Sequence, residues 1–373
     1  MRDAPVGSHY SVDQFSGKQE APTPLVFTLL RLLADGEFHS GEVLARQLGI
    51  SRASVSNALR GMESYGLTLY SVRGRGYRLV NPPQWLDAAN IASQMGELGK
   101  CFRIEILDSA SSSNTLLLQR ARLDVASGGA PSGSVLAVEW QSGGRGRLGR
   151  AWHSGLGNAL TFSLLWRFGC GLSALSGLSL ATGVALMRAL RDLGVEGARL
   201  KWPNDVLDTR SHNGSTKLAG ILIETQGDML GPSAVVIGIG LNLFLPQPVL
   251  HQINQPATSL ADMMDKTPET PRVPERNRLF AVLLRELHGV LREFAAHGFS
   301  ALRAEWESYH ALQDQPVCLS LPDGSSVVGV ARGVTEDGAL KLETISSETG
   351  AQGIQIFNAG EVSLRSGAEY VAA

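Results

Sequence analysis

The segment 141–152, near the middle of the chain, combines four glycines with three arginines. Strand-like runs of apolar residues flank it at 135–140 and 159–166, which predicts a loop between two β-strands. Glycine permits positive φ and lets a ligand approach the main chain closely, whereas arginine carries a permanent, forked positive charge. We therefore predict that this loop closes over an anionic group, either a phosphate or a carboxylate.

Within this loop, Gly144, Gly146 and Gly149 also match the glycine spacing of dinucleotide-binding turns. Such a turn leads directly into a helix and has an acidic residue about 20 positions later. Here a stretch rich in Gly and Ser follows, and then a strand pattern, so the match is weak. For the loop taken alone, a solvated hairpin tip and an RNA-binding arginine–glycine patch stay open as alternatives.

Length, charge and cysteine content limit the class of protein. A chain of 373 residues is long enough for two or three domains, and its net charge of −2 gives no overall attraction to nucleic acid or to an anionic membrane. The three cysteines are widely spaced and fit neither a disulfide framework nor a zinc site, so a cytoplasmic location is expected. Residues 1–23 lack the apolar core of a signal peptide and are expected to form a disordered tail. Residues 168–187 are uncharged, but glycines and serines interrupt them, which favours a buried helix over a membrane span.

Residues 24–83 form a unit of their own with a basic character. Helices are predicted at 25–34, 41–48 and 52–65, and the last two are separated by a short turn that contains glycine. Two strand patterns, 67–72 and 77–80, then enclose the basic tip Arg73-Gly74-Arg75-Gly76. Seven arginines against four acidic residues give this unit a net charge of +3, which favours contact with phosphates. We predict a winged helix-turn-helix that binds DNA through Ser51, Arg52, Ser54, Asn57, Arg60, Arg73 and Arg75. The alternative is a small helical interaction domain with solvated charges.

The rest of the chain divides into a connector and two further domains, which makes it a multi-domain α+β protein. Residues 84–99 are expected to be a linker with a short helix, and residues 100–312 mix strand patterns with helices such as 178–193 and 277–296, typical of a mixed sheet. Short strand patterns separated by Asp-Gly turns then predict a small β-barrel over 313–368. From 313 to 373, three basic residues against eight acidic ones give a net charge of −5, so this end is not expected to bind nucleic acid.

Four blocks in this order carry a resemblance to a known family: the loop 141–152, Lys201-Trp202-Pro203-Asn204-Asp205-Val206, and the segments 217–224 and 235–243. Together they resemble the catalytic core of the biotin–protein ligases. The resemblance covers about residues 24–368 and is to the bifunctional kind, which is both biotin ligase and biotin operon repressor. It implies a central ligase domain of the class II synthetase-like type and an SH3-like domain at the C-terminal end.

The chemistry implied is activation of a carboxylate by ATP as biotinyl-5'-AMP, followed by transfer to a lysine amine. Fixed positive groups, backbone N–H donors and Mg²⁺ stabilise the charge that develops on phosphorus. Arg145 and Arg147 are predicted to clamp the carboxylate and the phosphate, because the adjacent glycines let the loop fold over the ligand. Lys217 begins an apolar strand, where an unpaired lysine would be costly. The alternative is an edge-strand lysine that points to water.

The resemblance assigns further roles at these positions. It implies that Lys217 contacts the biotin carboxylate and the α-phosphate, that Lys201 reaches the triphosphate, and that Asp205 holds Mg²⁺ or orients the acceptor lysine. A purely structural turn is the alternative for Asn204 and Asp205. Residues expected around biotin are Ser112, Ser113, Asn114, Gln141, Gly144, Arg145, Gly146, Arg147 and Lys217. Residues expected around ATP or the adenylate are Arg147, Arg150, Trp152, Lys201, Asn204, Lys217 and Asn242.

Three further assignments also have structural alternatives. The serine and asparagine side chains at 112–114 can satisfy the donors and the acceptor of a ureido ring, but a plain N-cap before a helix at 115–121 would use the same residues. Trp152 could stack on the ligand or belong to the core. Asn242 is expected near the ribose or a metal, while Gly238 and Gly240 beside it permit close packing.

The sequence therefore predicts a cytoplasmic biotin ligase that uses ATP, biotin and Mg²⁺. The resemblance implies three partners, namely the biotin carboxyl carrier protein of acetyl-CoA carboxylase, operator DNA, and a second copy when adenylate is bound. No membrane partner is expected. A lipoate–protein ligase, a catalytically inactive ligand-sensing repressor, and a ligase without DNA binding are the rival interpretations.

Overall fold

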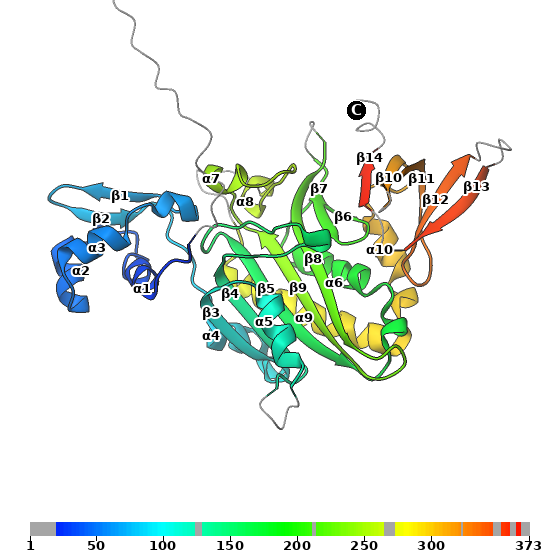
Figure 1. Cartoon of the computed structure of the whole chain (residues 1–373), viewed down its shortest axis with the longest axis horizontal. Coiled ribbons are helices and arrows are strands. Elements are labelled where there is room, and N and C mark those ends of the chain that lie inside the picture. Colours follow the sequence, from blue (N-terminus) through cyan, green and yellow to red (C-terminus); the bar gives the residue numbers. More distant parts are fainter. Residues whose placement is uncertain are drawn as a thin grey trace, which may run out of the picture.

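The computed structural model describes residues 20–123, 129–210, 214–264, 273–321, 324–345, 352–358 and 363–366. The N-terminal helical unit, the central sheet and the C-terminal sheet follow one another along the longest axis of the molecule (Figure 1). The expected α+β, multi-domain architecture is therefore confirmed. Most of the predicted disordered tail, residues 1–19, lies outside the described residues.

The N-terminal unit is a winged helix-turn-helix. Its elements are α1 (Pro24–Leu32), α2 (Gly41–Leu48), α3 (Arg52–Ala58), β1 (Leu69–Val72) and β2 (Gly76–Leu79). The Ser40 side chain accepts from the Val43 amide at the start of α2, and the Ser51 side chain accepts from the Ser54 amide at 3.0 Å at the start of α3. The predicted single helix over 52–65 is wrong, because α3 ends at Ala58 and a separate 3-10 turn, Met62–Tyr65, follows. Gly61 between them has φ 73°, a conformation that ends a helix.

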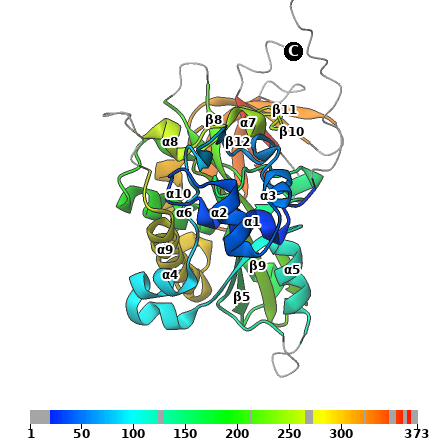
Figure 2. The same cartoon turned by 90° about the vertical axis from the view of Figure 1, so that its left-hand side faces the viewer.

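The core of this unit continues into the central domain. Trp140 and Leu156, which belong to the central domain, are buried in the same apolar cluster as Phe27 and Leu30 of α1. Tyr65 contacts Trp140 edge-on, with ring centroids 5.7 Å apart, and its carbonyl accepts from the Leu156 amide at 2.8 Å. The winged unit is therefore packed on the central domain, and Figure 2 views the molecule from its side.

The central domain is built on a seven-stranded mixed sheet with the order β3-β4-β5-β9-β8-β7-β6. Only the pair of β3 with β4 is parallel, and the other neighbours are antiparallel. The strands are β3 (Arg103–Ala110), β4 (Ser134–Gln141), β5 (Ala159–Phe168), β6 (Ala198–Lys201), β7 (Asp205–Asp208), β8 (Thr216–Gly227) and β9 (Ser233–Asn242). The expected mixed sheet is thus confirmed.

Alternate side chains of this sheet enter two apolar clusters, as the period of two in a strand requires. Val135, Leu164 and Ile237 belong to the large cluster that includes α6 (Leu178–Asp192) and α9 (Arg276–His297). Their neighbours Leu136, Leu165 and Val236 belong to the cluster that includes α5 (Ser113–Ala121). The sheet therefore separates α5 from α6 and α9, as Figure 1 shows.

The apolar segment near residue 180 is a core helix. Leu172–Asp192 is long and apolar enough to cross a membrane by length and composition, with a mean hydropathy of 1.3. It is largely buried, because α6 packs against α9 and the sheet. The prediction of a buried helix over 168–187 is confirmed for the part that forms α6.

The segment expected to be a linker, 84–99, is tied to the central domain. It contains α4 (Ala88–Met95). Just before it, the backbone of Gln84 and of Leu86 bonds to the side chains of Arg276 and Glu139, at 3.0 and 2.9 Å. Arg276 and Glu139 form an ion pair that is almost fully buried. The connection between the two domains is therefore held in one conformation by a buried charge pair.

The C-terminal domain follows α10 (Arg303–Tyr309). Its described strands form a five-stranded antiparallel sheet with the order β13-β12-β11-β10-β14, where a small SH3-like barrel was predicted. The strands are β10 (Pro316–Ser320), β11 (Ser326–Val334), β12 (Leu340–Ile345), β13 (Gln352–Phe357) and β14 (Ser363–Ser366). The predicted Asp-Gly turn at 336–338 is present, with Gly338 at φ 86°, whereas the turn at 322–324 lies partly outside the described residues. Trp202 donates its indole N–H to the Gly338 carbonyl at 3.0 Å, which links this sheet to the central domain.

Candidate functional site

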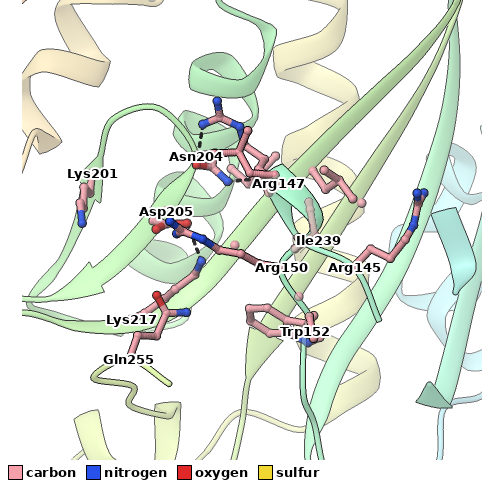
Figure 3. A pocket seen from close by; sticks show the side chains of 18 of the residues that line it. Arg145, Arg147, Arg150, Trp152, Lys201, Asn204, Asp205, Lys217, Ile239 and Gln255 are labelled. Carbon is pink, nitrogen blue, oxygen red and sulfur yellow. Dashed lines mark hydrogen bonds and ion pairs between the residues drawn. The ribbon is translucent and has the colours of Figure 1, made fainter. Parts of the chain in front are cut away.

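A cavity of about 830 Å³ opens in the central domain where the four sequence blocks meet. Its wall comes from the N-terminal end of α5, the loop between β4 and β5, the turn between β6 and β7, and the middle of β8 and β9 (Figure 3). Most of the residues predicted to bind biotin or ATP line it: Ser112, Ser113, Asn114, Gln141, Arg145, Gly146, Arg147, Arg150, Trp152, Lys201, Asn204, Asp205 and Lys217. The sequence blocks are therefore brought together in space.

Lys217 lies at one end of this cavity in an ion pair. Its Nζ atom is 2.7 Å from Asp205 Oδ1, and the two side chains are 17% and 19% exposed. The strand pairing of β7 and β8 shifts register beside Lys217, an irregularity that can re-aim a side chain next to a site. The alternative of an edge-strand lysine that points to water is wrong, because Lys217 is mostly buried and paired.

Arg147 is the second cation at this end. It donates to Asn204 Oδ1 at 3.2 Å, and Asn204 is in turn held by the backbone of Ile221 on β8, at 2.9 Å. Burial lowers the pKa of Arg147, the nearby Asp205 carboxylate opposes this change, and Arg150 lowers it further. Because the ordinary pKa of arginine lies far above neutrality, Arg147 stays charged. Figure 3 shows Arg147, Arg150 and Lys217 gathered around Asn204 and Asp205.

Buried side chains at the start of α5 form the polar end of the cavity. The Ser113 amide donates to Gln141 Oε1 at 2.7 Å. The Ser163 hydroxyl of β5 bonds to both Ser113 Oγ and Asn114 Oδ1, and Asn114 Nδ2 donates to Glu224 at 3.0 Å. Ser112 is the N-cap of α5 and also lines the cavity, so its capping role does not remove it from the cavity wall.

Arg145 is separated from Arg147, although sequence reasoning grouped the two as one clamp. The Arg145 guanidinium pairs with Glu224 of β8, and Figure 3 shows it pointing away from Arg147, Asp205 and Lys217. The backbone leaves the extended conformation at this point, because Gly146 is extended, with φ −114°, and the 3-10 turn Arg147–Gly149 begins directly after it. The two arginines therefore serve different ends of the cavity.

Two glycines of β9 let the wall close tightly. A Cβ atom on Gly240 would lie 2.4 Å from the Trp152 ring, and one on Gly238 would lie 2.2 Å from Asn114 Oδ1. The predicted role of these glycines in close packing is confirmed. Trp152 also lies near Lys217, whose Nζ is 5.9 Å from the ring centroid. The indole Nε1 of Trp152 is buried and has no hydrogen-bond partner within the described residues.

Two predicted residues lie outside the cavity lining. Gly144 closes the base of the loop, because its carbonyl accepts from the Trp152 amide at 2.9 Å. Asn242 donates to the Thr258 carbonyl at 3.0 Å and to the Lys217 carbonyl at 3.5 Å. It therefore supports the backbone of Lys217 from behind.

Sequence reasoning missed several residues of the site. Asn254 and Gln255 line the cavity, and Pro256 accepts from the Lys217 amide at 2.9 Å, but no local pattern marks their segment. Glu224 and Ser163 bond to predicted residues. An acidic residue and a serine within otherwise apolar strands were the available signals.

The donor set around Asp205 fits a Mg²⁺ ion that arrives with a nucleotide. Among the described residues there is no group of three His, Cys, Asp or Glu side chains that could hold a metal by itself. Mg²⁺ commonly uses one or two carboxylates together with substrate phosphates, and Asp205 supplies one carboxylate in the cavity.

The predicted DNA-contacting residues lie on α3, directly beside its two ends (Ser51 and Arg60), and on the wing. Arg52, Asn57 and Arg60 are exposed, and Arg60 donates to Asn57 at 2.9 Å. The Ser51 hydroxyl caps α3 and lies 2.9 Å from that of Ser54. On the wing, Arg73 is exposed and Arg75 stacks over Phe38 at 4.0 Å.

Comparisons with known proteins find three matching family models along the chain. Residues 108–242 match the Biotin/lipoate A/B protein ligase family, residues 26–78 match an HTH domain, and residues 314–365 match the Biotin protein ligase C terminal domain. The bifunctional ligase/repressor BirA of Salmonella typhimurium is 37% identical over 346 residues, which cover 92% of this chain and 98% of that protein. The biotin–[acetyl-CoA-carboxylase] ligase of Mycobacterium tuberculosis is 34% identical over 269 residues, or 71% of this chain and 91% of that protein. The solved structure of a biotin protein ligase from Aquifex aeolicus, in complex with biotin and ATP, matches with a TM-score of 0.55 at 25% identity and covers 71% of this chain and 99% of that one.

Proposed function

This chain belongs to the family of bifunctional biotin ligase/repressors, and from that premise we propose how its cavity performs the ligase reaction. The chain activates biotin with ATP and transfers it to a lysine of a biotin carboxyl carrier protein. The observation that carries the proposal is the division of the cavity into a cationic end around Lys217 and a polar end around Asn114. These two ends suit the carboxylate and the ureido ring of one elongated ligand.

The first step joins two anions, so we assign most of the lowering of its activation barrier to the cationic end of the cavity. A carboxylate oxygen of biotin attacks the α-phosphorus of ATP, and pyrophosphate leaves with the electron pair of the broken P–O bond. We assign to Lys217 and Arg147 the stabilisation of the negative charge on the reacting carboxylate and phosphate. Both are largely buried and lie beside Asp205. Fixed charges in a site with little water stabilise the transition state strongly. Mg²⁺, when bound with ATP at Asp205, would neutralise phosphate charge.

In the second step, the uncharged amine of a carrier lysine attacks the carbonyl carbon of the mixed anhydride. The C–N bond forms, AMP leaves, and the amine loses a proton. We assign Asp205 to orienting the incoming amine, because the Lys217 ammonium already lies 2.7 Å from its carboxylate. We propose that the loop 141–152, which includes Trp152, shields the anhydride from water, since Trp152 and other residues of this loop line the cavity.

The polar end favours biotin over lipoate. A ureido ring offers two N–H donors and one carbonyl acceptor, and buried groups left without partners would be costly. Ser113, Asn114 and Gln141 supply polar atoms at this end, whereas a lipoyl tail would leave them without a partner. A site built to hydrogen-bond a ligand rejects an analogue that lacks the polar group.

Transfer to a carrier tests the whole proposal. The full-length chain is incubated with ATP, Mg²⁺, biotin and a biotin carboxyl carrier domain, and the carrier is analysed by mass spectrometry. One biotinyl group on a single carrier lysine is expected, and it should be absent when that lysine is replaced by arginine. An unmodified carrier together with no biotinyl-5'-AMP would refute the proposal.

We further propose that the winged unit binds operator DNA and that a second copy joins when adenylate is bound. The exposed side chains of Arg52, Arg60 and Arg73 support contact with phosphates, which supply much of the affinity of such interfaces. A gel shift with the promoter DNA of biotin synthesis genes should strengthen when biotin and ATP are both added. Sedimentation should report a dimer under the same conditions. An unchanged shift and an unchanged monomer would contradict this regulatory role.

The three cysteines are free, which agrees with a cytoplasmic location.

A further inference from the structure

Glu224 contacts the polar end of the cavity, but no step of the reaction above uses it. Its side chain, on β8, is 22% exposed. It accepts from Asn114 Nδ2 at 3.0 Å and pairs with the guanidinium of Arg145. The carboxylate therefore joins the start of α5 to the loop 141–152, and both of these line the cavity.

The Glu224 carboxylate fixes which way the Asn114 side-chain amide faces. A carboxylate and a backbone carbonyl can only accept hydrogen bonds. Asn114 Nδ2 lies 3.0 Å from Glu224 Oε2 and 3.3 Å from the Leu222 carbonyl. The reverse orientation would set Asn114 Oδ1 against these two acceptors. Asn114 Oδ1 therefore faces the Ser163 hydroxyl, to which it is bonded.

The direction of the remaining hydrogen bonds follows from this orientation. Asn114 Oδ1 can only accept, so Ser163 donates its single hydroxyl proton to it. Ser163 Oγ also donates toward Ser113 Oγ at 2.8 Å, so its single proton is shared between the two acceptors. Hydrogen bonds thus link Ser163 to Ser113 and Asn114, and link Asn114 to Glu224. All of these residues except Glu224 are at most 4% exposed.

This direction decides what the cavity offers to a ligand. Ser113 and Asn114 line the cavity, and their side-chain oxygens, which accept from Ser163, each have a further lone pair to present. Gln141 accepts from the Ser113 amide through Oε1, which leaves its Nε2 as a donor. Two acceptors and one donor complement a cyclic urea, which has two N–H groups and one carbonyl.

We propose that Glu224 is a positioning residue that sets the hydrogen-bond polarity of the urea-binding end. It does not touch the reacting atoms. It acts through Asn114 and Ser163, and it makes the site specific for a ligand with two N–H donors. The inference rests on the proposed ligase function, because it names how that same cavity selects its acid.

This role is tested by measuring the binding of biotin to the full-length chain by calorimetry, without ATP. A biotin analogue methylated on one ureido nitrogen is the second probe, because it lacks one N–H donor. Glu224→Met should weaken biotin binding about tenfold, the typical effect of one misdirected buried hydrogen bond. The same variant should bring the affinity ratio of biotin to the methylated analogue close to one. Glu224→Gln keeps an acceptor oxygen for Asn114 and should retain most of this ratio.

Kinetics separate positioning from a general structural effect. With Glu224→Met, the KM for biotin should rise, while the KM for ATP and kcat at saturating biotin should stay unchanged. Glu105→Met is the matched control, because Glu105 also pairs with an arginine, Arg120 on α5, but lies outside the cavity lining. It should leave all these quantities unchanged. Ser163→Ala removes the central hydroxyl of the hydrogen-bond chain with only a small change in volume. If Glu224→Met fails to fold, the affinity ratio of Ser163→Ala tests the inference instead.

Three results would overturn the inference. Glu224→Met could weaken biotin and the methylated analogue equally, which would make Glu224 only a structural support. Glu224→Gln could lose as much discrimination as Glu224→Met, which would assign the effect to the charge on Arg145. Ser163→Ala could leave the ratio unchanged. Failure of the ligase function itself has a different signature, since the unmodified chain would then bind no biotin.

Discussion

Replacing Arg276 by methionine should lower the free energy of unfolding by at least about 5 kcal/mol. The guanidinium is 1% exposed and faces the Glu139 carboxylate, which is fully buried. Loss of one partner leaves an unpaired buried charge, which costs about 3–5 kcal/mol. Two backbone carbonyls, those of Gln84 and Ala159, also lose donors at 3.0 and 2.8 Å, and each unsatisfied group costs about 1–3 kcal/mol.

A double-mutant cycle separates the ion pair from these backbone contacts. Glu139→Leu alone should be about as destabilising as Arg276→Met, since it leaves the guanidinium unpaired. The double variant contains no buried charge, and it should be more stable than the sum of the single effects predicts, by about 3 kcal/mol. Urea unfolding of the full-length chain, followed by tryptophan fluorescence, measures each free energy.

The same pair holds the connection between the domains, so a second readout is available. Because Gln84 and Leu86 are bonded to this pair, Arg276→Met should also speed protease cleavage near residues 81–87. Additive effects of the two substitutions, within about 0.5 kcal/mol, would refute the reasoning. Unchanged cleavage would show that the pair does not fix the connector.

Three further predictions concern the site, the DNA interface and the response to acid. Lys217→Ala should slow adenylate formation by about 100-fold or more, while the far-ultraviolet circular dichroism stays unchanged. The control Lys100→Ala, at an exposed pair with Glu97, should have no effect. Normal adenylate formation by Lys217→Ala would remove the role assigned to Lys217. Arg52→Ala should weaken operator binding and reduce the slope of log affinity against log salt by about 1, and an unchanged slope in a salt titration would contradict a phosphate contact. Burial lowers the pKa of His310 below its ordinary value of 6.5, so the unfolded state binds the proton more readily, and this contribution to stability is present above pH 6.5 and lost below it. His310→Gln should flatten the fall of Tm with acidification, and an equally steep fall would show that other groups cause it.

Local signals in the sequence predicted the elements that depend on local chemistry. The helix predicted at 41–48 is α2 without change of bounds, and the Ser51 N-cap begins α3 as expected. The over-long third helix had the right periodicity, but Gly61 in a left-handed conformation stops it. A pattern of apolar positions does not reveal where the backbone reverses, because that depends on how the next segment packs.

Contacts between distant segments were beyond the sequence signals. Glu224 and Asn114 are 110 positions apart, and Arg276 and Glu139 are 137 apart. Neither pairing leaves a local spacing that could be read. The sequence grouped Arg145 with Arg147 for the same reason, namely that no local signal reveals distant partners. Two nearby cations in a loop do not indicate which strand each side chain will face.

Release of pyrophosphate from ATP by the purified full-length chain tests the central claim most directly. The reaction is measured with biotin and, separately, with lipoate, each with Mg²⁺ and without a carrier protein. We predict release that requires biotin and is not supported by lipoate. No release with biotin, or release with lipoate alone, would contradict the assignment of this cavity to biotin activation.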